Sequence, residues 1–342
     1  MGLGDQAWPY ICDWDDDGDW DMLIGGGIGW PRILVNHGTH SRPAFSEAQN
    51  IRSQGRPIRI RMSQVFPGCE GYKHDMGYTY PKFIDWDGDG LKDLMLPNIT
   101  NRIFWYKNIG TKKTPKFGLR RQILPDGYTE TDETLAVTGQ YLMANWESEP
   151  QADQPFWWRT GAGFADFNND RLMDMITLDG FTRELQLFRQ YKDDTGRLRL
   201  KEGRELKLTD GRVISEKVVG RKKKHWTESF QCCDWDNDGL IDIMYSLAGG
   251  HGNMQDGGSI YLLRNRGTKK EPMFDKPRTM SCFGSPIMIT SHGPHPGVGD
   301  INGDGKPDIL TCHEDSIYAF FSHIALEMPN RPRYRLSQLI KK

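Results

Sequence analysis

The chain of 342 residues lacks several features that define other classes of protein. It contains no apolar run of about 18 residues, the length that a membrane-spanning helix needs. Its net charge of −2 gives it no basic excess of the kind that nucleic-acid-binding domains carry. Six cysteines are too few for a disulfide scaffold, so we expect mostly free, buried thiols. We therefore expect neither a membrane span nor a nucleic-acid partner.

Three local patterns are weak signals. Residues 1–4 lack the basic start and the apolar segment of a signal peptide, so an exported form has lost its signal or carries it outside this sequence. The basic run 221–224 is typical of a solvated hairpin tip. A metal site formed by Cys232, His251 or Cys282 stays open as an alternative, although their spacing matches no standard pattern.

What the sequence does contain is an acidic loop that occurs five times. Each copy has Asp or Asn at positions 1, 3 and 5, usually Gly at position 6, and Asp at position 9. The copies begin 66 to 81 residues apart and span residues 13–21, 85–93, 166–174, 234–242 and 300–308. A recurring unit of this kind predicts a repeat architecture.

The loop residues are those of a calcium-binding turn. Side-chain oxygens at positions 1, 3, 5 and 9 and a backbone carbonyl at position 7 offer a hard cation about five or six ligands. Short apolar runs bounded by Gly follow, such as 22–24 and 94–96, which favours strands over the helices of an EF-hand. The third copy is the weakest, because Asn168 removes a charge and Arg171 replaces the Gly. The predicted calcium ligands are Asp13, Asp15, Asp17, Asp21, Asp85, Asp87, Asp89, Asp93, Asp166, Asn168, Asp170, Asp174, Asp234, Asp236, Asp238, Asp242, Asp300, Asn302, Asp304 and Asp308.

A second motif follows three of the loops. An Asn-x-Gly-Thr turn at residues 36–39, 108–111 and 265–268 leads to Pro-x-Phe at 43–45, 115–117 and 272–274. The Asn-x-Gly pair predicts a tight hairpin, and the Pro-x-Phe predicts the start of the next strand. Four strands per unit, with no competing helical periodicity, predict an all-β fold: a β-propeller of four-stranded blades forming one domain over residues 1–342.

These motifs resemble the FG-GAP/VCBS repeat family. Asp-Trp-Asp-x-Asp-Gly-x-x-Asp, an apolar strand and Asn-x-Gly-Thr together form that family's hallmark, and the resemblance covers nearly the whole chain. It implies a propeller with five motif-bearing blades; members more often have seven, so two blades without the motif, or a truncated chain, stay open. The resemblance leaves function undetermined, because such propellers serve as integrin heads, lectins, adhesion modules and polysaccharide lyases.

Repeat position also predicts where a functional site lies. The segment five to eleven residues before each loop leads into the innermost strand, so these five segments are expected to converge on the propeller axis. A Trp at such a position is more often blade packing than a sugar platform, whereas His and Arg are not needed for packing. The convergent candidates are Trp8, His74, Tyr78, Tyr80, Trp157, Trp158, Arg159, His225, Trp226, His292 and His295.

This set contains the groups that a β-elimination of a uronate needs: a cation to neutralise the carboxylate, an acid and base, and aromatic faces. Similarity to the propeller-type lyases of ulvan, rhamnogalacturonan and rhamnosyl-glucuronate implies catalytic roles for five of the residues. They are His74, Tyr78, Arg159, His225 and His292. The remaining six are expected to bind substrate: Trp8, Tyr80, Trp157, Trp158, Trp226 and His295.

We therefore expect a monomeric, calcium-dependent lyase that acts on an acidic polysaccharide. Bare carboxylate sites suit millimolar extracellular calcium, so we expect it outside the cell or in the periplasm. The alternative is a non-catalytic carbohydrate-binding or adhesion module. A hydrolase is less favoured, because it needs a free carboxylate pair and only Asp75, Glu147, Glu149 and Asp153 stand outside the loops as candidates. The long connection 119–161 is either a binding loop or a decorated edge.

Overall fold

The computed structural model describes most of the chain, and the structural statements below concern that part. The described residues are 7–40, 42–66, 68–70, 75–144, 154–157, 159, 161–219, 227–248, 258–289, 293–313, 316–320 and 325–327. Strands dominate, and no helix among these residues is long and apolar enough to cross a membrane. The prediction of an all-β fold is confirmed for the described residues, which are mostly strands with a few short helices.

Five sheets of three or more strands contain the five acidic loops, one in each sheet. The first sheet is β1 (Trp8–Cys12), β2 (Asp21–Gly25), β3 (Arg32–Leu34) and β4 (Gln49–Asn50). The second is β7 (Lys82–Ile84), β8 (Asp93–Leu96), β9 (Ile103–Asn108) and β10 (Phe117–Ile123), extended by β5 (Arg52–Ser53) and β6 (Arg56–Pro57). The third is β11 (Gly163–Ala165), β12 (Asp174–Leu178), β13 (Leu185–Phe188) and β16 (Arg204–Glu205).

The last two sheets complete the series. The fourth is β18 (Thr227–Cys233), β19 (Asp242–Ala248), β20 (Gly258–Leu263), β22 (Arg278–Cys282) and β23 (Ser285–Pro286), with β24 (Met288–Ile289) and β28 (Ala325–Glu327) at its edges. The fifth is β25 (Gly297–Gly299), β26 (Asp308–His313) and β27 (Ser316–Phe320). Two short pairs lie outside these sheets: β14 (Gln190–Lys192) with β15 (Leu198–Leu200), and β17 (Lys207–Leu208) with β21 (Met273–Phe274).

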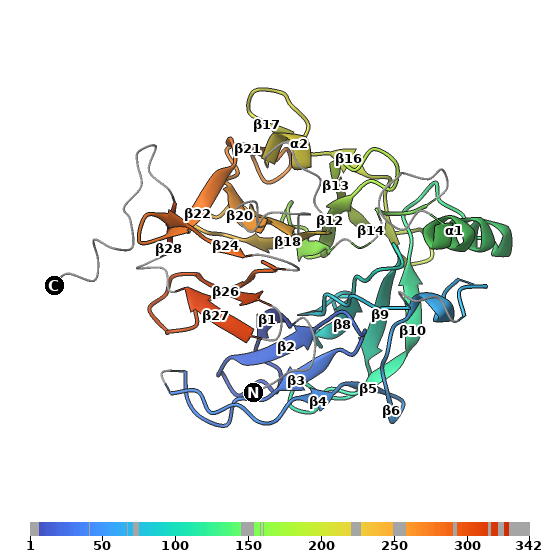
Figure 1. The fold of residues 1–342 in the computed structure, drawn as a ribbon, viewed down its shortest axis with the longest axis horizontal. Coiled ribbons are helices and arrows are strands. Elements are labelled where there is room, and N and C mark those ends of the chain that lie inside the picture. Colours follow the sequence, from blue (N-terminus) through green and yellow to red (C-terminus); the bar gives the residue numbers. More distant parts are fainter. Residues whose placement is uncertain are drawn as a thin grey trace.

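The sheets follow one another around a ring, which is the arrangement of a β-propeller (Figure 1). β1 of the first sheet lies beside β25 of the last, so the two ends of the repeat series meet and close the ring. Each sheet begins with an edge strand, an acidic loop and a second strand. The number of blades stays a prediction.

The second strand of each sheet is packed on both faces. Every residue of β8, β12 and β19 is buried, as their continuous apolar runs indicate. Leu94 and Ile243, for example, are completely buried, and burial of one such side chain contributes about 1.5–3 kcal/mol. These strands therefore hold the acidic loops on a rigid core.

The last Asp of the acidic loop and the Asn of the following turn form one hydrogen-bonded unit. In the second sheet, the Asn108 amide donates to Asp93 Oδ1 over 2.6 Å. Asn108 Oδ1 in turn accepts the amides of Gly110 at 2.9 Å and Lys116 at 3.1 Å. The same bonds occur around Asn36 and Asn265. The two sequence motifs therefore recur together because each satisfies the backbone of the other.

The 119–161 connection, which departs from the repeat, is partly helical. It contains α1 (Asp132–Ala144), whose first turn carries Asp132 and Glu133 and whose Thr131 Oγ1 accepts the Thr134 amide at 3.1 Å. Two shorter helical turns are α2 (Glu216–Val219) and a 3₁₀ turn at Met62–Gln64. A capping Thr before two acidic residues was the available signal, and the repeat pattern obscured it.

All six cysteines are free, as expected. Three are buried, and Cys232, Cys233 and Cys282 are half-buried. The alternative of a Cys/His metal site named Cys232, His251 or Cys282, and of these His251 lies outside the described residues. The basic run 221–224 also lies outside them.

Candidate functional site

Strand register separates the two ends of the sheets. In the first sheet Cys12 pairs with Asp21 of the acidic loop, whereas Trp8 pairs with Gly25 at the other end of β2. In the fourth sheet Cys233 pairs with Asp242, and Thr227 pairs with Ala248. We call the end with the acidic loops the loop end and the end with Trp8 and Thr227 the aromatic end. Any site built from both motifs would have to span a whole strand.

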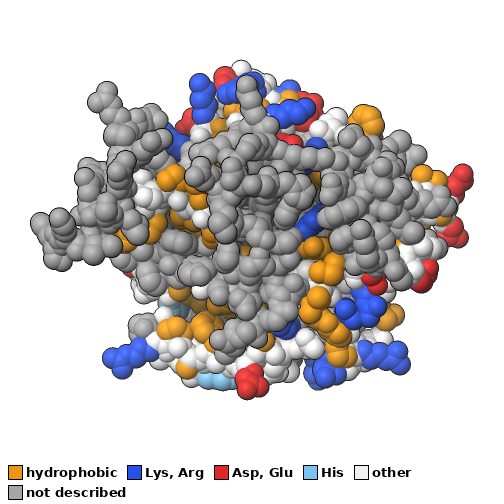
Figure 2. Space-filling view, in the orientation of Figure 1, with side chains coloured by type: hydrophobic (Ala, Val, Ile, Leu, Met, Phe, Trp, Pro, Cys, Tyr) orange, Lys and Arg blue, Asp and Glu red, His pale blue; other side chains and the backbone are white. Residues whose placement is uncertain are grey.

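Predicted axial residues from three sheets lie together at the aromatic end. The Trp8 ring stacks on Tyr80 at a centroid distance of 4.4 Å and on Tyr78 at 5.5 Å. His295 lies 4.6 Å from Trp8 and 5.3 Å from Tyr80, measured between ring centroids. All four side chains are buried, so they form a packed cluster and not an exposed sugar platform. On the face shown in Figure 2, the Lys and Arg side chains that are visible lie mainly toward the rim of the view.

Arg159 joins this cluster as a buried cation. It is 2% exposed, and its guanidinium carbon lies 3.9 Å from the centre of the Tyr78 ring. The Tyr80 hydroxyl donates to the Arg159 carbonyl at 3.4 Å. Arg159 and Tyr78 both have left-handed backbones, with φ of 54° and 42°, which is uncommon for residues other than Gly. Such conformations cluster at functional sites, where surrounding structure holds them.

The charge of Arg159 lacks a matching anion among the described residues. Its Nε and Nη2 are buried without hydrogen-bond partners. Burial lowers the pKa of Arg159, and only the hydroxyl groups of Tyr78 and Tyr80 act against that shift. An unpaired buried guanidinium is costly, so a negatively charged ligand would stabilise it.

His295 is fixed by neighbours from β18. Its Nδ1 lies 3.0 Å from Ser229 Oγ and its Nε2 lies 3.4 Å from Thr227 Oγ1. Both ring nitrogens are therefore within hydrogen-bonding distance of hydroxyl groups. These contacts fix the orientation of the His295 ring, and its expected role in substrate binding stays a prediction.

Trp157 leads to a buried ionic network that the sequence did not predict. The Arg183 guanidinium lies 5.2 Å from the Trp157 ring centre and donates from Nε to Glu228 Oε2 at 2.9 Å. Tyr245 donates its hydroxyl to the other oxygen of Glu228. Arg183 also pairs with Glu216 of α2 at 3.2 Å. The sequence signal was a Glu within β18, a strand whose first five residues are all buried.

Several predicted site residues lie outside the described part of the chain: His74, Trp158, His225, Trp226 and His292. The hydrolase candidates Glu147, Glu149 and Asp153 lie outside it as well. Asp75 is described, and it accepts the Ser63 amide at 2.9 Å and the Ser63 hydroxyl at 2.8 Å while pairing with Arg61. Asp75 is therefore engaged in holding the 3₁₀ turn.

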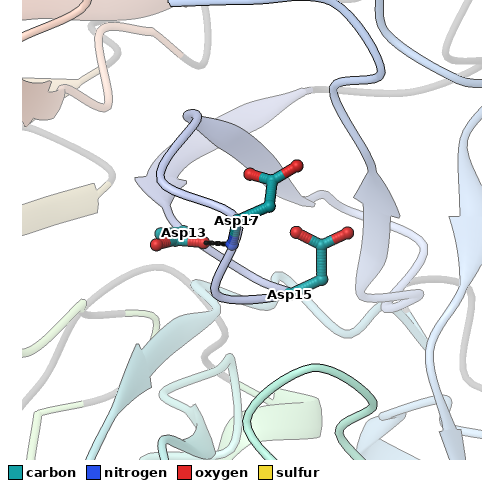
Figure 3. A group of neighbouring side chains, drawn as sticks. All are labelled: Asp13, Asp15 and Asp17. Carbon is teal, nitrogen blue, oxygen red and sulfur yellow. Dashed lines mark hydrogen bonds between the residues drawn. The ribbon is translucent and has the colours of Figure 1, made fainter.

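At the loop end, three acidic loops bring carboxylates close enough to share a cation. Oxygens of Asp13, Asp15 and Asp17 lie within 4.8 Å of one another, as Figure 3 illustrates. The other two groups are Asp85 with Asp87 and Asp89, and Asp234 with Asp236 and Asp242. Hard oxygen ligands in this number suit calcium.

In each of these three loops, the carboxylate at loop position 3 has an oxygen that the protein leaves unsatisfied. Oδ1 of Asp15, Asp87 and Asp236 is buried and has no hydrogen-bond partner. Burial and repulsion from Asp17 and Asp13 raise the pKa of Asp15. A bound cation would satisfy these oxygens, so the donor set fits calcium.

The last Asp of the loop differs from the exposed ligands. Asp21 is buried and accepts backbone amides on both oxygens, from Trp14 at 2.7 Å and Asn36 at 2.7 Å. Burial raises the pKa of Asp21 to about 6 and that of Asp93 to about 7. The last loop Asp therefore binds backbone amides with its carboxylate. The sequence analysis predicted it only as a calcium ligand and missed this structural role.

The third loop fits a cation least well. Arg171 occupies the Gly position with φ of 71°, and the Asn168 amide group donates to Asp170 Oδ2 at 2.8 Å. Arg189 pairs with Asp174 at 2.5 Å. In the fifth loop the Asn302 amide group lies 3.4 Å from Asp304 Oδ2.

One family comparison identifies the repeat. Residues 227–311, which run from β18 through the fourth and fifth acidic loops into β26, match the model of the FG-GAP-like repeat. These residues carry an FG-GAP-like repeat. The match is confined to these residues, and it agrees with the propeller arrangement of the sheets. The FG-GAP match covers the sheet that contributes Thr227, Ser229 and Glu228 to the aromatic end.

Other comparisons add little to the FG-GAP assignment. No curated protein sequence matches the chain. Among solved structures, BBS1N in complex with ARL6DN, soaked with lead, has a TM-score of 0.36 and 7% identity, covering 96% of this chain and 94% of that one. The same complex soaked with mercury has a TM-score of 0.34 and 10% identity, covering 97% and 98%. Scores this low support no inference about function.

Proposed function

We propose that this protein is an exported polysaccharide lyase that cleaves a uronate-containing polysaccharide by β-elimination at the aromatic end of a calcium-stabilised FG-GAP propeller. The observation that carries the proposal is Arg159. It is a buried guanidinium with two unsatisfied nitrogens, held among Trp8, Tyr78 and Tyr80. A uronate carboxylate has the charge and the two oxygens that this group lacks.

The chemistry follows from neutralising that carboxylate. Arg159 pairs with the C5 carboxylate and so makes the C5 proton easier to remove. A base takes the C5 proton, the C4–O bond breaks, a C4–C5 double bond forms, and the departing oxygen takes up a proton. Tyr78 is the described acid–base candidate because Arg159 lies against its ring. His74, His225 and His292 remain proposed catalytic groups, and the clustered aromatic rings, which are buried in this structure, would contact the sugar only after the surrounding chain moves.

Calcium has a structural role in this proposal. The loops beginning at Asp13, Asp85 and Asp234 would hold the ion, which would cross-link each loop. Arg159 is nearly inaccessible, so ligand binding requires the chain around it to move. We propose a monomer acting outside the cell or in the periplasm.

A non-catalytic carbohydrate-binding or adhesion module is the second candidate. One observation favours it: both nitrogens of His295 are close to hydroxyl groups, as expected for a ring that is held in place and transfers no proton. A binding module needs Arg159 for affinity but needs no proton transfer.

The deciding experiment follows the ultraviolet absorbance of the unsaturated uronate product during incubation with a panel of uronate polysaccharides and calcium. A lyase gives rising absorbance on at least one polymer, and Arg159→Met abolishes the rise. Arg204→Met is the matched control, because Arg204 is an exposed surface residue paired with Glu271. A flat trace from folded protein that still binds a uronate polymer would replace the lyase with the binding module.

A further inference from the structure

One position of the repeat lies next to the acidic loop in four of the sheets. It is the residue directly before the Asn or Gln whose amide binds the last loop Asp, and strand register confirms that it is equivalent in four sheets. In each of these sheets, the residue directly after the last loop Asp pairs with a residue of the third strand. These third-strand residues are Leu34, Tyr106, Phe188 and Leu263, and the residue after each of them occupies the equivalent repeat position. These equivalent residues are Val35, Lys107, Arg189 and Arg264.

In the second sheet this residue is a cation inside the candidate calcium loop. Lys107 Nζ donates to Asp87 Oδ2 and lies 2.7 Å from Asp89 Oδ2. Asp87 and Asp89 belong to one of the close carboxylate groups. The ammonium group therefore occupies the same oxygens that a metal ion would use.

The third and fourth sheets use arginine in the same way. Arg189 Nη1 lies 2.5 Å from Asp174 Oδ2. Arg264 Nη1 lies 3.1 Å from Asp236 Oδ2, and Arg266 adds a more distant charge at 3.9 Å. All three loops thus carry a positive charge supplied by the chain itself.

The first loop is different. Val35 is half-buried and packs on an apolar core cluster. Among the described residues, the basic side chains near this loop are two histidines and one lysine. His40 lies 3.7 Å from Asp19, His37 acts on Asp15 only through its electrostatic field, and Lys92 donates to the Asp13 carbonyl and not to its carboxylate. Asp13, Asp15 and Asp17 form no ion pair with a described Lys or Arg, and Asp15 Oδ1 is unsatisfied.

We propose that the residue before the turn sets the cation requirement of each blade: Lys107, Arg189 and Arg264 act as built-in competitors of calcium, and Val35 makes the first loop the tightest calcium site. This inference rests on the calcium part of the proposed function and is independent of lyase activity. A metal ion entering the second or fourth loop must displace a charged side chain, whereas the first loop receives it without that cost.

Calorimetric titration of the calcium-free full chain with calcium chloride tests this. Lys107→Met keeps the side-chain length and removes the charge, so it is expected to strengthen calcium binding at the second loop by about tenfold or more. Val35→Lys is expected to weaken the tightest site by a similar factor, whereas the neutral control Val35→Met leaves it unchanged. Asp15→Asn is expected to remove the tightest site, and Asp87→Asn to spare it.

Three results would overturn the inference: unchanged affinities in Lys107→Met, unchanged tight binding in Val35→Lys, or loss of the tightest site in Asp87→Asn. Circular dichroism of each variant establishes that it is folded, and Lys107→Met tests the idea by a gain of binding if Val35→Lys does not fold. Absence of calcium binding in every variant would overturn the inference and the calcium part of the proposed function, while the absorbance assay would still decide lyase activity.

Discussion

Removal of the Asn108 side chain should destabilise the second sheet strongly, because Asn108 connects the acidic loop to the hairpin turn. Asn108 is 1% exposed. Its Oδ1 accepts the Gly110 and Lys116 amides, and its Nδ2 donates to the Lys92 carbonyl at 3.1 Å. Ala supplies none of these three bonds, and each contributes about 0.5–1.5 kcal/mol. We therefore expect Asn108→Ala to lower the free energy of unfolding by about 2–4 kcal/mol.

Urea unfolding followed by tryptophan fluorescence measures this change. Lys113→Ala in the same turn is the control, since Lys113 is exposed and its replacement is expected to change stability by less than about 0.5 kcal/mol. The measurement is repeated with calcium and with a chelator, because the loss should be present in both. A loss below about 0.5 kcal/mol for Asn108→Ala would refute the idea that loop and turn stabilise each other.

Three further substitutions test other parts of the structure. Burial lowers the pKa of Lys82 to about 7, below its ordinary value of 10.5. The unfolded chain therefore binds a proton at Lys82 at a higher pH than the folded chain does. The stability contributed by neutral Lys82 is complete above the unfolded pKa and is lost as the pH falls from there through about 7. Lys82→Met should therefore flatten the dependence of melting temperature on pH between about 7 and 10, and an unchanged profile would contradict this assignment. Glu228→Gln should cost about 1.5–3 kcal/mol in urea unfolding, because Arg183 loses its fully buried anionic partner and keeps only Glu216. Glu205→Gln, in an exposed pair with Lys207, should cost less than about 1 kcal/mol. Arg159→Met should raise the melting temperature while abolishing uronate binding, and a lowered melting temperature would indicate that Arg159 is structural.

The sequence predicted those features that depend on the repeat. Equivalent positions before the acidic loops correctly placed Trp8, Tyr78, Tyr80, Arg159 and His295 near one another, because each segment leads into the first strand of its sheet. The all-β propeller followed from the same periodicity. The catalytic roles and the calcium ions stay predictions.

Features specific to single blades were harder to predict. The ion pair between Arg183 and Glu228 joins residues 45 positions apart, and neither belongs to a repeated motif. α1 lies in a connection that has no counterpart in the other repeats. The burial of the aromatic rings depends on how the sheets approach one another, which alternation along one strand does not specify. Lys107 contacts its loop from a neighbouring strand, a relation that becomes visible only with the register.

The bond between the last loop Asp and the residue before the hairpin has a consequence for how this chain can diverge. Its two partners lie 15 residues apart in the first and second sheets, 16 in the third and 23 in the fourth. Part of the extra length in the fourth sheet lies in β19 and β20, which have 7 and 6 residues against 5 and 3 in β2 and β3, while the bond itself is retained. Insertions between the second and third strands lengthen the segments around Arg159 without disturbing the loop end. Relatives should therefore vary in length at 26–31, 97–102, 179–184 and 249–257, so that new ligand specificities arise by insertion on a scaffold that stays the same.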